Sequence, residues 1–395
     1  MPELLIKKST TIAGFEELLA TPRLGEHTLV VPNSISHAGA MGCAMAFTQF
    51  LLTWSRSSSN REIRTFLSPS DDDGHARFVQ RIHGFAAAYY GRSLAAEGDS
   101  GEDIRRPLMR AARNRILAMH RADLGTTSRG SEIEMIFVSG AKHEFHGSLY
   151  SKAPNSAELA DPESHGRLVR NKNDLNRFLE NCFRALNVNT SEVLKRHLLR
   201  TDLPFGSLLA EAFRNTAEHA CSDPRGSKLE KNMRCVRVSR TQIARDWIES
   251  FNVGAPGARS SAEQYFTALA ARYGARSSNN VDVVEISIFD SGKGFSRTMG
   301  ASKALGDESD LELVRKCFLK HQSAKSQSTS GVGMYRILSA VSALGGFMRV
   351  RTSTAEAFYG GAENDTVAAD PSSFVHGGMA PVEGTLITVG IPIVF

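Results

Sequence analysis

Short apolar runs alternate with longer amphipathic segments over the first 140 residues. The apolar runs predict strands, and the segments with apolar residues three or four apart predict helices. Strands are expected at 28–31, 63–67 and 133–138, and helices at 38–54, 75–90 and 105–120. An Asp-rich turn at 68–74 can cap the helix that follows it. This alternation predicts an α/β unit with a small parallel or mixed sheet.

The second half of the chain has a different pattern. Residues 151–172 are polar and contain three Pro or Gly residues, which is typical of a linker or flexible loop. Helices are expected at 173–186, 191–199, 204–219, 261–273 and 335–344, strands at 233–239, 283–289, 347–352 and 384–392, and a loop at 355–383. The pattern therefore predicts an α/β input or partner-docking domain at 1–150, a linker at 151–172, and a second domain at 173–395 that begins with two bracing helices.

Composition narrows the class of protein. The chain has 395 residues, 41% hydrophobic and 23% charged, which suits two ordinary globular domains. The longest apolar runs stay below the 18 residues of a membrane span and a signal-peptide core is missing, so a cytoplasmic location without a membrane partner is expected. The five cysteines are scattered, which predicts reduced thiols rather than disulfides or a zinc site. The net charge of +5 comes from dispersed Lys and Arg residues, so a nucleic-acid partner is not indicated.

One predicted helix carries polar residues that suit phosphate chemistry. Glu211, Asn215 and His219 are four residues apart, so their side chains share one helix face. Asn215 offers the hard oxygen that Mg²⁺ prefers, and Glu211 can orient or deprotonate an attacking water or hydroxyl. The same spacing also occurs in ordinary surface pairs, so this helix alone does not define a site.

Two glycine motifs follow the helix. Asp290 comes directly after a buried strand, where a carboxylate is costly unless it is used, and Gly292 and Gly294 leave space for a ligand beside the backbone. Gly331, Val332 and Gly333 precede a helix, whose free N–H groups and positive end suit phosphate oxygens. A β-turn and an ordinary helix start are the simpler interpretations of the two motifs.

The order E-x-x-x-N-x-x-x-H, strand plus D-x-G-x-G, then G-x-G plus helix resembles the ATP-binding module of the GHKL superfamily, over about residues 200–395. That superfamily includes gyrase, Hsp90, MutL, histidine kinases and anti-sigma-factor serine kinases. The resemblance implies a Bergerat-type α+β two-layer sandwich, with a mixed sheet and helices on one face. It also implies that ATP and Mg²⁺ are the cofactors, that Asn215 binds the metal and that Glu211 is catalytic.

The resemblance assigns further residues. Asp290 would accept a hydrogen bond from the exocyclic amine of adenine, and Thr385 on the last strand would lie behind the base. Residues 296–330 match the superfamily's mobile lid, in which Lys325 is either a phosphate ligand or a solvated cation. His219 is either the histidine that anti-sigma kinases often carry or a packing residue. The insertion of about 40 residues between the strands at 233–239 and 283–289 departs from compact kinase modules.

A histidine-kinase phosphoacceptor is a separate hypothesis. His143 and Glu144 are followed by an apolar residue, as in that box, but Ser148 stands where the box has Pro and the segment follows a strand. A loop with solvent histidines is the alternative and the simpler interpretation.

Three functions remain open on the sequence. The leading one is a Mg-dependent ATP-hydrolysing switch, a hydrolase that signals through lid closure to the N-terminal domain or to an unidentified protein partner. The second is a protein kinase of the anti-sigma serine kinase or histidine kinase type, and the third is a non-catalytic nucleotide-sensing scaffold. A homodimer is compatible with each of them.

Overall fold

The computed structural model describes most of the chain outside the 141–230 region. The described residues are 2–36, 41–96, 101–120, 128–129, 132–140, 182–183, 186, 216, 227, 229, 231–244, 254–273, 280–300, 308–319, 333–361 and 370–393. Among them, no helix is both long enough and apolar enough to cross a membrane.

The amino-terminal segment builds a four-stranded parallel sheet in the order β1-β2-β3-β4. Its strands are β1 (Glu3–Leu5), β2 (Thr28–Val31), β3 (Glu62–Thr65) and β4 (Ser93–Ala95). The connections are α1 (Ile12–Leu19), η1 (Leu24–Glu26), α2 (Cys43–Ser57), α3 (Asp72–Val79) and α4 (Ile82–Tyr90), and α5 (Arg105–His120) follows β4. Parallel neighbours need such crossovers, and the alternating pattern predicts them.

A longer sheet of eight strands has the order β11-β10-β9-β12-β8-β7-β6-β5, and all of its pairings are antiparallel. Its strands are β5 (Ser128–Arg129), β6 (Glu132–Gly140), β7 (Lys231–Ala244), β8 (Asn280–Asp290), β9 (Phe347–Ser353), β10 (Ala355–Gly360), β11 (Val375–His376) and β12 (Val382–Ile393). The helices described among these strands are α11 (Pro256–Tyr273), α12 (Gly294–Gly300), α13 (Asp310–Lys316), α14 (Gly333–Ala343) and the short η3 (Pro371–Ser373).

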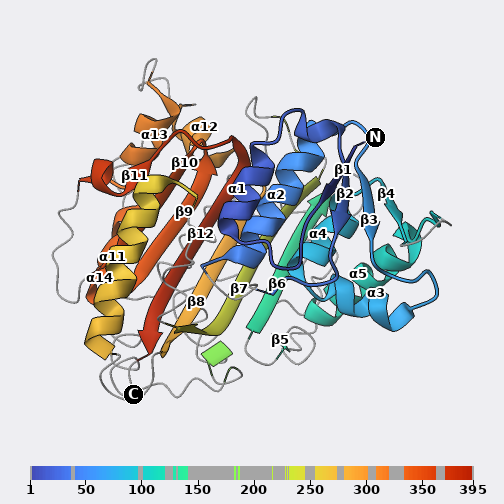
Figure 1. Cartoon of the computed structure of the whole chain (residues 1–395), viewed down its shortest axis with the longest axis horizontal. Helices are drawn as coiled ribbons and strands as arrows, with labels where there is room; N and C mark the ends of the chain where they lie inside the picture. Colours follow the sequence, from blue (N-terminus) through green and yellow to red (C-terminus); the bar gives the residue numbers. More distant parts are fainter. Residues whose placement is uncertain are drawn as a thin grey trace, which may run out of the picture.

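Helices cover both faces of the long sheet. Figure 1 shows α1, α2, α4 and α11 in front of it. On the other face, α12 and α14 pack against β9 and β12. The chain is thus a mixed α/β protein with one parallel and one antiparallel sheet, consistent with an α+β class.

Three buried carboxylates join the front helices to the long sheet. The N–H of Gly42, at the N-cap of α2, donates to Glu285 Oε1 on β8 at 2.9 Å. The N–H of Ile82, the first residue of α4, donates to Glu134 Oε2 on β6 at 3.0 Å. The N–H of Ala255, just before α11, donates to Glu356 Oε2 on β10 at 2.7 Å. A carboxylate at a helix N-terminus satisfies an unpaired donor and complements the helix dipole.

The carboxylates are paired with arginines on the same face. Arg349 Nε lies 2.7 Å from Glu356 Oε1, and both side chains are fully buried. Arg237 lies between Glu134 (3.5 Å) and Glu285 (3.8 Å). Buried charges persist only when they are paired and hydrogen-bonded, so this face requires the amino-terminal helices to be docked on it.

Most predicted elements are present. The strand at 28–31, the helix at 105–120 and the strands at 233–239, 283–289 and 347–352 match β2, α5, β7, β8 and β9. The Asp-rich turn caps α3, because Asp71 accepts from the N–H of Gly74 at 2.7 Å. β7 also pairs directly with β8, as the resemblance implies, despite the insertion that contains α11.

Four expectations differ from the structure. The strand at 133–138 is β6, which pairs with β5 and β7 in the long sheet and does not join the amino-terminal sheet. The helix at 75–90 is two helices, because Arg81 is extended. The loop expected at 355–383 contains β10 and β11. The long sheet is antiparallel where a mixed sheet was expected, and helices cover both of its faces rather than one.

Two of these differences have a local cause. The chain turns at Arg81 so that α4 can pack closely on the end of α3, and only Gly fits at Gly84, where a Cβ would lie 2.1 Å from the carbonyl oxygen of Phe78. β10 is buried on both faces except at its last residue. Its sequence therefore lacks the alternation of apolar and polar residues that predicts a half-buried strand.

Candidate functional site

Four polar side chains form one row across four neighbouring strands. In the sheet register Arg234 of β7 is opposite Asp290 of β8, Asp290 is opposite Thr385 of β12, and Thr385 is opposite Thr352 of β9. Directly opposite residues point to the same face, with Cβ atoms about 5 Å apart. The row therefore places a carboxylate between a guanidinium and two hydroxyls, at the end of β8 and the start of β12.

Asp290 is a buried carboxyl group that accepts a hydrogen bond from the turn after β8. Its exposed fraction is 8%, and its Oδ1 accepts from the N–H of Gly292 at 2.8 Å. Burial raises the pKa of Asp290 to about 7, although the Gly292 N–H and the positive charges of Arg234 and Arg56 act in the opposite direction. A carboxyl group with a pKa near neutrality, on a row of polar side chains, is a candidate for ligand binding.

Glycines bring the backbone close to this row. Gly384, immediately before Thr385, has φ +76, and a Cβ there would lie 2.0 Å from the carbonyl oxygen of Asp290. Gly294 has φ +80, and a Cβ there would lie 3.0 Å from Thr352 Oγ1. Both positions use the left-handed region, which favours Gly. Gly294, the last residue of D-x-G-x-G, and Gly384 thus shape the backbone on either side of the polar row.

The hydroxyls at the other end of the row are held by α12 and by each other. The N–H of Phe295 donates to Thr352 Oγ1 at 3.1 Å, and Thr352 Oγ1 lies 3.3 Å from Thr385 Oγ1. Ser296 and Ser353 hydroxyls are 2.6 Å apart. The D-x-G-x-G turn, β9 and β12 are therefore one connected structure.

No protein-family model, curated protein or solved structure matches the chain. The site is therefore interpreted from its own geometry. The described residues contain no group of three His, Cys, Asp or Glu side chains that could hold a metal ion.

Helix α14 begins near the end of the long sheet that carries the polar row. α14 begins at Gly333, ends at Ala343 and packs on β9, which begins at Phe347. Because the connection is so short, the helix runs back along the strand, and its N-terminus points toward the end of β9 that carries Thr352. The positive end of α14 thus faces the same end of the sheet as Asp290.

The structure brings together some of the predicted site residues. Asp290, Gly292, Gly294 and Thr385 lie in one place, and Gly333 begins α14. The others lie outside the described residues: Glu211, Asn215, His219, Lys325, Gly331 and Val332, as does His143.

Sequence reasoning missed Arg234 and Thr352. Both lie within predicted strands, at 233–239 and 347–352, and neither belongs to a motif. Only the pairing register shows that they flank Asp290 and Thr385. Both strands carry further arginines, Arg237 in one and Arg349 and Arg351 in the other, so the sequence alone does not single out Arg234 or Thr352.

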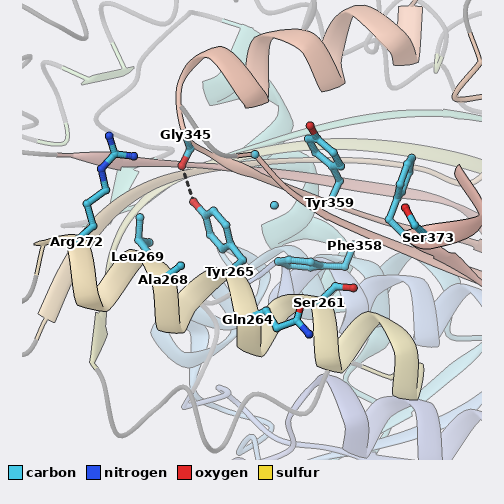
Figure 2. A pocket seen from close by; sticks show the side chains of 13 residues that line it. Ser261, Gln264, Tyr265, Ala268, Leu269, Arg272, Gly345, Phe358, Tyr359 and Ser373 are labelled. Carbon is cyan, nitrogen blue, oxygen red and sulfur yellow. Dashed lines mark hydrogen bonds between the residues drawn. The ribbon is translucent and has the colours of Figure 1, made fainter. Parts of the chain in front are cut away.

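A cavity of about 380 Å³ lies at the other end of the long sheet. It is lined by residues of α11, by Phe358 and Tyr359 of β10 and by Gly345 after α14. Figure 2 shows the Tyr265 ring projecting from α11 toward Gly345, whose carbonyl oxygen accepts from the Tyr265 hydroxyl at 2.7 Å. Because Gly345 precedes β9 and Thr352 is near its end, this cavity is separate from the row at Asp290.

Proposed function

We propose that this protein is an ATP-binding regulator with a GHKL-type, Bergerat-like nucleotide site, and that it hydrolyses ATP with the help of Mg²⁺. The observation that carries the proposal is the register that sets Thr385 directly opposite Asp290, both buried, on the strand pair that the D-x-G-x-G and final-strand motifs assign to adenine.

The described residues fit an adenine base. The amine of adenine donates hydrogen bonds, and the Asp290 carboxylate can accept one. The hydroxyls of Thr385 and Thr352 can donate to or accept from a ring nitrogen or a bridging water. Gly294 and Gly384 let the backbone pass close to Thr352 and to the Asp290 carbonyl oxygen, and so they hold the turn that carries the Asp290 carboxyl group.

The phosphate end of the site rests on the sequence motifs and on α14. The N-terminus of α14, with Gly331 and Gly333, would bind phosphate oxygens through backbone N–H groups. Asn215 would hold Mg²⁺, which supplies charge neutralisation at the phosphates, and Glu211 would orient the attacking water. Closure of the segment between Gly294 and Gly333 over the nucleotide would then signal to the amino-terminal helices or to a partner.

One pair of assays tests the proposal. Titration calorimetry with ATP, in the presence and absence of Mg²⁺, measures binding, and phosphate release measures turnover. We expect slow hydrolysis that Glu211→Ala reduces at least 100-fold, the usual range for general base loss, while ATP affinity stays within a few-fold. Asp290→Asn is expected to weaken ATP binding itself.

The outcomes separate the alternatives. Transfer of labelled γ-phosphate to a protein, with the label retained, would favour a kinase over a hydrolase. Tight ATP binding without turnover would favour a nucleotide-sensing scaffold. Failure of the wild-type protein to bind ATP would refute the proposal altogether.

A further inference from the structure

Helix α2 carries a polar stripe on the face that meets the long sheet. Gln49, Thr53 and Arg56 are spaced four and three residues apart, so their side chains lie above one another on a helix. Gln49 is 2% exposed in a helix that is otherwise mostly apolar and buried. A buried polar stripe of this kind needs partners, and the partners identify what it does.

Each residue of the stripe contacts backbone or side chain at the Asp290 end of the sheet. Gln49 Nε2 donates to the carbonyl oxygens of Arg351 (3.2 Å) and Glu383 (3.3 Å). Thr53 Oγ1 accepts from the N–H of Glu383 at 3.0 Å.

Arg56 completes the stripe with two different contacts. Its Nη2 donates to the carbonyl oxygen of Ser291 at 2.5 Å, and its Nη1 lies 2.6 Å from Glu383 Oε2. The guanidinium thus connects the turn after β8 to the start of β12. A planar guanidinium can hold two acceptors in a fixed geometry, which an ammonium group cannot do.

These contacts reach the three segments that form the polar row. Arg351 precedes Thr352, Glu383 is two residues before Thr385, and Ser291 follows Asp290. The length of α2 makes this possible, because it begins over Glu285 on β8 and its 15 residues extend about 22 Å. That is close to the roughly 20 Å that β8 covers between Glu285 and Ser291.

We propose that Gln49, Thr53 and Arg56 are positioning residues for the base site, through which the amino-terminal unit controls nucleotide affinity and base preference. The inference rests on the proposed nucleotide site and adds the element that regulates it. Any movement of α2 would displace the backbone on both sides of Asp290, and by linkage a bound nucleotide would hold α2 in place.

Electrostatics gives Arg56 a second effect. Its positive charge is one of the influences that lower the pKa of Asp290 and so partly offset the effect of burial. Replacing Arg56 by a neutral residue should therefore make Asp290 harder to ionise, whereas Lys keeps the charge and gives up the two-point contact.

The test compares binding of ATP and inosine triphosphate from pH 6 to pH 8 in wild type, Arg56→Gln, Arg56→Lys and Thr53→Val. The ratio of the two affinities isolates the base, because both ligands carry the same triphosphate. We expect Arg56→Gln to bind ATP about tenfold more weakly, which corresponds to the loss of one charge-assisted hydrogen bond. Its ratio of ATP affinity to inosine triphosphate affinity should change at a higher pH than in wild type. Arg56→Lys should lose affinity while the midpoint of the pH profile stays in place.

Arg64→Gln is the matched control, since Arg64 on β3 forms an ion pair at 2.5 Å with Glu3 on β1, within the amino-terminal sheet, and so does not contact the strands of the base site. It should leave both affinity and midpoint unchanged. Thr53→Val keeps the shape of the side chain and loses the acceptor for Glu383, so it tests the stripe even if the Arg56 variants fail to fold.

The outcomes distinguish the two proposals. If wild type binds ATP with a pH-dependent preference and the Arg56 and Thr53 variants give the same curves, the positioning role is refuted while the nucleotide site stands. If wild type does not bind ATP, the proposed function fails and this inference fails with it. Weaker binding in the variants, with the midpoint moved only in Arg56→Gln, supports the positioning role.

Discussion

The ionisation of Asp290 should make base recognition depend on pH near neutrality. The carboxylate form accepts a hydrogen bond from the amine of adenine, whereas the protonated form can donate one to the 6-oxygen of hypoxanthine. Burial raises the pKa of this group to about 7. ATP should therefore bind better above pH 7, and inosine triphosphate relatively better below it.

The size of the effect follows from that pKa. With a value of about 7, roughly ten in eleven molecules are ionised at pH 8 and roughly one in eleven at pH 6. Apparent affinity scales with the competent fraction, so ATP should bind about tenfold more weakly at pH 6, a loss of about 1.4 kcal/mol. If inosine triphosphate requires the protonated form, the affinity ratio changes by up to about 100-fold over the same range.

Titration calorimetry with both nucleotides at pH 6, 7 and 8 measures the ratio directly. Repeating the ATP titration in two buffers of different ionisation enthalpy counts the protons released, which should approach one per ATP at pH 6. Asp290→Asn removes the titrating group and should flatten the ratio. A wild-type ratio that is constant from pH 6 to 8, or one that varies equally in Asp290→Asn, would refute the assignment of Asp290 to the base.

Two further predictions concern the sheet that holds the site. Gly384→Ala should lower the free energy of unfolding by clearly more than the cost of about 1–2 kcal/mol for a left-handed residue, because its Cβ would meet the Asp290 carbonyl oxygen. Gly378→Ala is the control, since Gly378 has φ +81 and open space around it, and it should lose only the cost of the left-handed backbone. Equal losses of the two variants in urea unfolding would contradict the reasoning. Burial raises the pKa of Glu285 to about 7, partly offset by Arg237 and the Gly42 N–H, so the folded state holds this proton more tightly and stability falls as the pH rises from the unfolded pKa to the folded one. Glu285→Gln lacks that loss and should gain about 2.5 kcal/mol relative to wild type between pH 5 and pH 8; urea unfolding at the two pH values checks it, and a difference independent of pH would count against a titrating Glu285.

The sequence predicts local elements well where the pattern is strong. The apolar run 283–289 ends in Asp290 and identifies both β8 and the turn that follows it. The resemblance also predicts that Thr385 lies close to Asp290, and in the sheet register the two residues are directly opposite each other. Arg234 and Thr352 could not be found this way, since register between strands far apart in the chain depends on the whole sheet.

The sheet that β6 joins was harder to predict, for a physical reason. β6 has the apolar character that a strand of either sheet would have, and its partner β7 follows about 90 residues later. Glu134, Glu285 and Glu356 look like ordinary solvent-facing positions of their strands in the sequence. They are buried because α4, α2 and α11 place N-terminal N–H groups over them, and no local pattern describes that arrangement.

The two faces of β8 explain why the amino-terminal unit and the polar row are connected. Alternation along the strand directs Glu285 toward α2 and Asp290 toward the opposite face, and β12 does the same with Thr388 and Thr385. A rigid pair of strands therefore carries the start of α2 on one face and the candidate base site on the other, while Arg56 ties the end of α2 to the same strands. Docking of the amino-terminal helices and the shape of the site are then one structural property, because neither strand can shift without disturbing buried charge pairs on one side and the Asp290 row on the other.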